Sequence, residues 1–137
     1  MPKEPLENDD ENCIYGSNFT IRFCDEAEDS FREALTHVTK AKGVSLSGAI
    51  SALLERKANG QLSGESDEKE GKLPDGSNFR AIKKIPIRCY YWQSKTHKAT
   101  IFVSHFKYKD QQKLDSRDSQ RVISNWWAYE KNSEVER

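Results

Sequence analysis

The hydrophobic and polar positions of the chain follow two different periods, which separate expected strands from expected helices. In the N-terminal part, Phe19, Ile21 and Phe23 alternate with polar residues. Alternation of this kind is typical of a strand with one buried face, so we expect a first strand over residues 19–23. Three further runs towards the C-terminus also predict strands, and they cover residues 79–85, 87–92 and 99–106.

Between the first strand and these three runs, apolar residues recur at spacings of three and four, as they do along one face of a helix. We expect one helix over residues 25–42, ended by Gly43, and a second from residue 45 or 47 to about residue 58. Because the link between them is so short, we expect an antiparallel helical hairpin. A last helix is expected over residues 116–131, where apolar residues again line one flank.

Polar and charged stretches lie outside these elements. Residues 1–13 are acidic and carry little apolar surface, so we expect a flexible tail there, and a second flexible end over residues 132–137. The segment 60–77 is rich in Gly, Ser and charge, which predicts an exposed loop. Residues 14–131 then form one domain with the order β-α-α-β-β-β-α. This order predicts an α+β fold in which the helical hairpin and the C-terminal helix pack on a small antiparallel sheet.

Composition limits the classes of protein that fit. The chain has 137 residues, 35% of them hydrophobic, which suits one modest core. We expect no membrane segment, since no apolar run has the length of a membrane helix and the start lacks the apolar stretch of a signal peptide. The three cysteines are widely spaced without a C-x-x-C pair. We therefore expect neither a disulfide framework nor a zinc site, and a cytoplasmic location.

The net charge of zero conceals an uneven distribution of charge. Residues 78–121 carry 11 Lys or Arg and 3 Asp or Glu, whereas residues 1–77 carry 9 and 16. Concentrated positive charge among aromatic residues and histidine is typical of a surface that binds a polyanion. We therefore expect a nucleic-acid partner.

The candidate chemistry is that of a metal-free cationic site without a cofactor. The chain has no glycine-rich phosphate loop, no histidine pair at metal spacing and no paired-cysteine ligand set. RNA cleavage without a metal needs a base for the 2′-hydroxyl proton, an acid for the leaving 5′ oxygen and positive charge on the phosphorane. His, Tyr and Lys suit the proton transfers, and Arg and Lys bind phosphate. The last three strands supply these residue types: Arg80, Lys83, Lys84, Arg88, Tyr90, His105, Lys107 and Lys109.

Each candidate also has a structural interpretation. Lys83 and Lys84 fit the solvated face of an edge strand, since charged edges discourage aggregation. Arg88 lies in a central strand and must meet a carboxylate, a ligand or water, because an unpaired buried charge is costly. Tyr90 fits core packing. His105 ends an apolar strand, and its pKa range suits either proton transfer near neutral pH or a satisfied buried histidine.

Two of the expected strands carry motifs of a known family. The order of elements, together with FRAIKK-x-PIRCYYW and TIFVSHFKYKDQQK, resembles the RelE/HigB-like toxins of bacterial toxin–antitoxin pairs. In that family a strand of the type hR-hhY precedes one of the type hhhhHxFxKK and a final helix. Residues 87–91 and 101–107 are similar to these two strands, and the resemblance is clearest over residues 73–120.

The resemblance implies a toxin that enters the A site of the ribosome and cuts messenger RNA, and that a cognate antitoxin holds inactive. It implies that Arg88 holds the scissile phosphate and that His105 or Tyr90 moves protons. The residues expected to contact the RNA backbone are Arg80, Lys83, Lys84, Lys107, Lys109 and Lys113. Two alternatives remain: a toxin of this fold directed at gyrase or another protein, and a nucleic-acid-binding regulatory module without toxicity.

Overall fold

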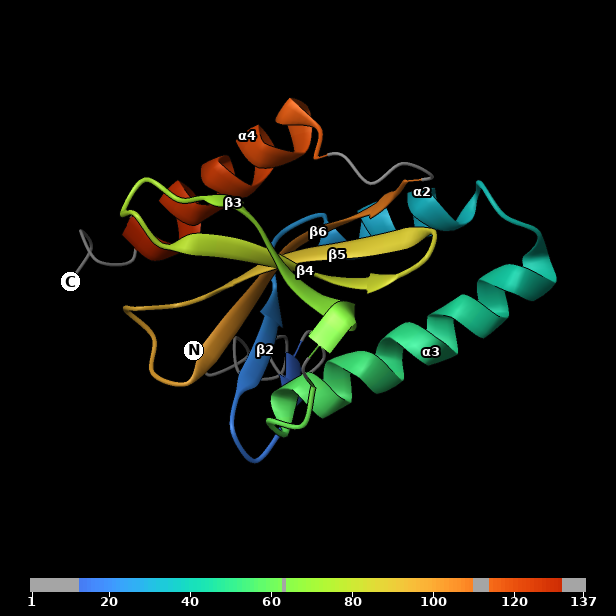
Figure 1. Cartoon of the computed structure of the whole chain (residues 1–137), viewed down its shortest axis with the longest axis horizontal. Helices are drawn as coiled ribbons and strands as arrows, with labels where there is room; N and C mark the ends of the chain where they lie inside the picture. The colour runs from blue at the N-terminus through green and yellow to red at the C-terminus, as the bar shows by residue number, and fades with distance from the viewer. Residues whose placement is uncertain (1–12, 63, 110–113, 132–137) are drawn as a thin grey trace, which may run out of the picture.

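The computed structural model describes residues 13–62, 64–109 and 114–131. They form an α+β fold around a six-stranded sheet with the strand order β1-β2-β6-β5-β4-β3. Its strands are β1 (Cys13–Tyr15), β2 (Thr20–Phe23), β3 (Asp67–Lys72), β4 (Asn78–Lys84), β5 (Ile87–Gln93) and β6 (Thr100–Tyr108). Its helices are α2 (Ala27–Leu35), α3 (Lys40–Ala58) and α4 (Ser116–Trp126), with a 3-10 turn η1 (Gly64–Ser66) and a π-helical turn η2 (Trp127–Lys131). Figure 1 shows α4 on one side of the sheet and α3 on the other.

The sheet is mixed, and the expectation of a purely antiparallel sheet was wrong. Strand β2 runs parallel to β6, with Ile21 opposite Ile101, whereas the other four neighbouring pairs are antiparallel. Connectivity explains the difference. After β2 the chain passes through both helices to the far edge of the sheet, which gives the long crossover that a parallel pair needs. Three antiparallel connections then return it to β6, beside β2.

The helical hairpin is not formed, and the expected boundary between the two helices was also wrong. Helix α2 ends at Leu35, and Gly43 lies inside α3 instead of ending a helix. Thr39 sets the start of α3, because its side chain accepts a hydrogen bond from the Lys42 backbone N–H. Helix α2 packs on β6, whereas α3 packs against β1, β2 and β4. The two helices therefore cover different parts of the sheet.

Strand β3 occupies much of the segment 60–77, which the sequence analysis expected to be an exposed loop. It pairs antiparallel with β4 as an edge strand, although its sequence DEKEGK has no alternating apolar positions. Its acidic residues meet basic residues of β4, and opposite charges on neighbouring strands stabilise their pairing. Strand β1 likewise begins at Cys13, inside the expected tail, and pairs with β2. The element order is thus β-β-α-α-β-β-β-β-α.

Two apolar clusters join the layers, one on each face of the sheet. The cluster beneath α2 and α3 includes Ile21 and Val103, and the cluster beneath α4 includes Phe79 and Val122. Because helices cover both faces of β5, residues 87–92 are all buried. The strands expected over residues 79–106 and the last helix are confirmed within a few residues. No helix in the described ranges is long and apolar enough to cross a membrane.

Gly71 tests the position of β3, because a Cβ built there lies 2.7 Å from the ring of Phe79. Phe79 is fully buried and has no room to move. We expect Gly71→Ala to lower the free energy of unfolding by about 1–3 kcal/mol, measured by chemical denaturation. The control is Gly48→Ala on α3, where a Cβ meets no atom within 4 Å, and it should raise stability by about 0.5–1 kcal/mol. An unchanged stability of Gly71→Ala would contradict the packing of β3 on Phe79.

Candidate functional site

The register of the sheet brings five expected site residues to the face that α4 covers. Arg88 lies opposite Lys107, and Tyr90 lies opposite His105. Directly opposed residues of two antiparallel strands point to the same side of a sheet, and Tyr90 belongs to the apolar cluster beneath α4. Lys83 of β4 lies opposite Arg88 and therefore shares this face.

Arg80 and Lys84 lie on the other face of the sheet. Arg80 is opposite Tyr91 and Lys84 is opposite Ile87, and both of these partners belong to the cluster beneath α2 and α3. The expected RNA contacts are therefore divided between two faces. Lys113, the remaining one of the expected contacts, lies outside the described residues.

His105 is fully buried at the centre of a chain of hydrogen bonds. Its Nε2 lies 3.0 Å from Asp118 Oδ1, and its Nδ1 lies 2.8 Å from Ser104 Oγ. The Asn125 side-chain amide donates to the same Ser104 oxygen at 2.9 Å, and Lys109 Nζ lies 3.2 Å from Asp118 Oδ2. Because an ionised carboxylate can only accept, Nε2 carries the imidazole proton and Nδ1 accepts from the Ser104 hydroxyl.

The electrostatics of this network favour a neutral histidine beside an ionised aspartate. Burial lowers the pKa of His105, and the hydrogen bond to Asp118 counteracts only part of that effect. Burial opposes ionisation of Asp118 too, but hydrogen bonds from His105 and Lys109 outweigh it and keep the pKa of Asp118 below its ordinary value. Both imidazole nitrogens are engaged and the ring is covered. In this arrangement His105 connects β6 to α4 and does not contact solvent.

Tyr90 lies against His105, with the two ring centroids 5.1 Å apart. Its hydroxyl is buried and makes no hydrogen bond within the described residues. Burial raises the pKa of Tyr90 above its ordinary value, and Asp118 adds to this effect while Arg88 opposes it. Tyr90 therefore keeps its proton at neutral pH. Such a phenol suits the role of proton donor better than that of base.

The acidic side chains of β3 surround the cations on this face. Lys83 Nζ lies 2.6 Å from Glu68 Oε1 and 2.9 Å from Glu70 Oε2. Arg88 is only 5% exposed, and its Nη1 lies 3.6 Å from Glu70 Oε1. Burial opposes the charge on Lys83, but the hydrogen bonds to both glutamates outweigh it and raise the pKa of Lys83. Two cations of the candidate site thus already have anionic partners.

Asp67 plays the same part on the opposite face of the sheet. Its carboxylate lies 2.8 Å from Lys57 Nζ of α3 and 3.0 Å from Arg80 Nε of β4, and it accepts a hydrogen bond from the Tyr91 hydroxyl at 2.5 Å. Although burial raises the pKa of Asp67, the hydrogen bonds from these three groups outweigh it and lower that pKa overall. Asp67 therefore ties β3 to α3, β4 and β5.

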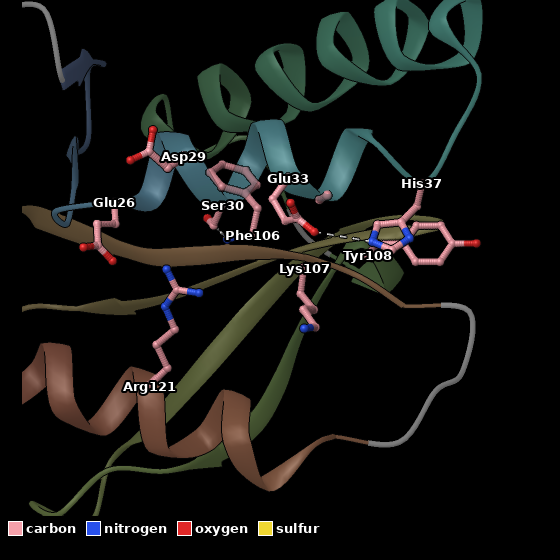
Figure 2. Close-up of a pocket in the computed structure, with 10 residues that line it drawn as sticks. Glu26, Asp29, Ser30, Glu33, His37, Phe106, Lys107, Tyr108 and Arg121 are labelled. Carbon is pink, nitrogen blue, oxygen red and sulfur yellow. Dashed lines mark hydrogen bonds and ion pairs between the residues drawn. The ribbon is translucent and has the colours of Figure 1, made fainter.

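Lys107 and Arg121 differ from the paired cations. Within the described part of the chain, neither side chain forms an ion pair or a hydrogen bond. Both line a pocket of about 380 Å³ formed by residues of α2, β6 and α4, which Figure 2 shows with its lining side chains. Lys107 was expected from the sequence as a site residue. Arg121 was not expected, because it lies in the last helix, outside the three basic strands that supplied the candidate residues.

The sequence reasoning also missed the acidic partners of the site. Glu68 and Glu70 lie in the segment where a loop was expected, and Asp118 lies in the expected last helix, outside the basic strands. A signal for the first two was present in Leu73-Pro74-Asp75-Gly76-Ser77, because Pro-Asp-Gly is typical of a tight turn. A turn between an acidic run and a basic strand predicts a hairpin with paired charges.

Comparisons of the chain with protein-family models, with curated proteins and with solved structures gave no match. Function must therefore be inferred from the arrangement of the side chains. Among the residues whose positions are described, no three His, Cys, Asp or Glu side chains are grouped so as to hold a metal ion.

The His105 network should make the stability of the fold depend on pH. The unfolded chain restores the pKa of His105 to its ordinary value of 6.5, whereas the folded value is lower. Between these two values the unfolded state binds more protons, so stability falls as the pH falls through this window. Asp118 adds a second loss at more acidic pH, because its folded pKa is depressed.

We expect the melting temperature of the wild type to fall between about pH 7.5 and about pH 5.5, and His105→Gln to lose most of this dependence. Differential scanning calorimetry at several pH values measures both slopes. His37→Gln is the control, because the His37 side chain is 49% exposed, and it should keep the slope of the wild type. If His105→Gln melts with the same pH dependence as the wild type, the assignment of His105 as a buried neutral histidine is wrong.

Proposed function

We propose that this chain is a RelE/HigB-like toxin of a bacterial toxin–antitoxin pair and that it cleaves messenger RNA at the ribosome by metal-free attack of a 2′-hydroxyl. One observation carries the proposal: in the neighbouring strands β5 and β6, Arg88 lies opposite Lys107 and Tyr90 lies opposite His105, all on one face of the sheet. Two cations beside a protonated phenol can hold a phosphate and donate a proton to its leaving oxygen.

In this mechanism Arg88 and Lys107 hold the scissile phosphate and stabilise the negative charge that develops on it. The proton of the attacking 2′-hydroxyl passes to solvent water, and Tyr90, which holds its own proton at neutral pH, protonates the leaving 5′ oxygen. His105 is a positioning residue, because it contacts the Tyr90 ring and is itself fixed by Asp118. Lys83 and Lys109 add to the positive electrostatic potential of the site. Arg80 and Lys84 contact the RNA backbone away from the reacting phosphate.

Access to Arg88 requires competition between RNA and β3. A carboxylate and a phosphate use the same donors of a guanidinium group, and Glu70 lies 3.6 Å from Arg88. RNA bound on the ribosome would displace the Glu70 side chain from Arg88, while Asp67 keeps β3 in place. The proposed partners are a cognate antitoxin, the ribosome and its messenger RNA in the cytoplasm, with no cofactor.

A toxin of the same fold directed at a protein target is the second candidate. The observation that favours it is that Lys83, Arg88 and His105 all have carboxylate partners. If these charges serve only to hold the sheet together, RNA binding is not needed to explain them. On this alternative, substitutions that keep the fold intact but remove the phosphate-binding charges leave toxicity unchanged.

Substitution of Arg88 separates the two candidates. We expect Arg88→Ala to abolish growth arrest after induced expression in a bacterium, because the scissile phosphate loses its guanidinium. Arg56→Ala is the control, since Arg56 is an exposed residue of α3, and it should remain toxic. Circular dichroism checks that each variant folds. The double variant Arg88→Gln/Glu70→Gln removes both charges of the pair, so that a loss of toxicity is not caused by a buried carboxylate left without Arg88. Full toxicity of either Arg88 variant would favour the protein-directed candidate.

Neutralisation of β3 tests the competition between its carboxylates and phosphate. We expect Glu70→Gln to bind a short single-stranded RNA about threefold to tenfold more tightly than the wild type, because phosphate then meets less competition at Arg88 and Lys83. Fluorescence anisotropy at fixed salt measures the affinity, since salt alone weakens such binding. Glu55→Gln is the control, because it changes the net charge by the same amount as Glu70→Gln but on the exposed surface of α3. Equal gains in both variants would contradict a specific role of β3.

A further inference from the structure

A pocket lies beside the edge of β6, where α2 approaches from one side of the sheet and α4 from the other, as Figure 2 shows. The edge is available there because β2 ends at Phe23, opposite Val103. Helix α2 then takes the place of a neighbouring strand. Its Ser30 hydroxyl accepts a hydrogen bond from the Phe106 backbone N–H at 2.8 Å. The pocket has a volume of about 380 Å³.

The walls of this pocket carry opposite charges. The wall formed by α2 and the residue before it bears three carboxylates, and the other wall bears Lys107 of β6 and Arg121 of α4. In Figure 2 the Arg121 side chain extends from α4 towards β6, and Lys107 extends into the space between β6 and α4. Both cations lack a partner within the described residues. The carboxylates belong to Glu26, Asp29 and Glu33.

An aromatic pair lies at one end of the pocket. The rings of His37 and Tyr108 stack with their centroids 4.6 Å apart and their planes at 13°. Figure 2 places this pair next to Glu33. Flat rings of this kind support a stacked nucleic-acid base. A carboxylate at the edge of such a base accepts a hydrogen bond from its amino group.

We propose that this pocket binds one nucleotide of RNA, with the phosphate at Lys107 and Arg121 and the base against Tyr108 and His37. The inference rests on the proposed RNA-cleaving function and extends it, because Lys107 also lies opposite Arg88 in the sheet. The pocket thus holds a nucleotide next to the one whose phosphate is cut.

The charge pattern selects the class of ligand. Carboxylates repel a simple anion from the α2 wall, although Asp29 is paired with Arg32 and Glu33 with His37, and two cations repel a simple cation from the opposite wall. A nucleotide satisfies both walls when its base carries an exocyclic amino group, since the amino group faces the carboxylates and the phosphate faces Lys107 and Arg121. Adenine, cytosine and guanine, which carry an exocyclic amino group, therefore fit the pocket better than uracil.

Titration of the full chain with adenosine 5′-monophosphate tests the inference, with NMR shifts of backbone amides as the readout. We expect the shifts to concentrate at Phe106, Tyr108 and the C-terminal half of α2. Lys107→Gln and Arg121→Gln should each weaken binding by about tenfold, because each removes a charged hydrogen-bond donor to the phosphate. Lys98→Gln is the matched control, since Lys98 is an exposed lysine just before β6, and it should bind as the wild type does.

Three results would overturn the inference. Inorganic phosphate that binds as tightly as the nucleotide would reduce the pocket to an anion site. A loss in Lys98→Gln equal to that in Lys107→Gln would assign the binding to general surface charge. A toxic chain that shows no nucleotide binding at this pocket would refute the pocket and leave the proposed function standing. Conversely, a chain that binds the nucleotide in this pocket but causes no growth arrest would support the pocket and refute the toxin.

Discussion

The ion pairs that β3 forms with its neighbours hold together the part of the molecule on which the candidate site depends. On one face, Asp67 joins Lys57 of α3 to Arg80 of β4. On the other face, Glu70 lies between Lys83 of β4 and Arg88 of β5. Removing one partner of a buried pair costs about 3–5 kcal/mol, because the other charge is left uncompensated. Strand β3 therefore supplies both an edge to the sheet and the counter-charge of the basic strands.

This pairing separates the described cations of the candidate site into two groups. Those near β3 have carboxylate partners, so their positions are fixed before any ligand binds. Lys107 and Arg121 lie away from β3, in the pocket between α2, β6 and α4, and they have no partner in the described part of the chain. In the proposed function, RNA would first meet these two cations, and only a ligand that binds strongly enough to displace Glu70 would reach Arg88. That order of contacts would favour RNA held on the ribosome over free anions.

Sequence patterns predicted the elements whose signal is local and apolar. The runs that became β4, β5 and β6 were recognised because each contains several apolar residues and a short polar loop separates the last two. Their register brought Arg88, Tyr90, His105 and Lys107 to one face. Strand β3 was missed because charge pairing across the sheet, and not apolar alternation, stabilises it. The parallel β2–β6 pair and the His105–Asp118 contact depend on residues that only the complete fold brings together. The end of the first helix was misplaced because the Thr39 cap outweighed the expected break at Gly43.

The central claim is that the chain cuts messenger RNA by attack of a 2′-hydroxyl, and the ends of cellular transcripts test it most directly. After induced expression in a bacterium, 5′-end mapping should reveal new cuts inside coding regions, with 5′-hydroxyl groups downstream and cyclic phosphates upstream. These ends should be absent from cells that express Arg88→Ala. Growth arrest without new transcript ends would contradict the claim and leave a protein target as the explanation.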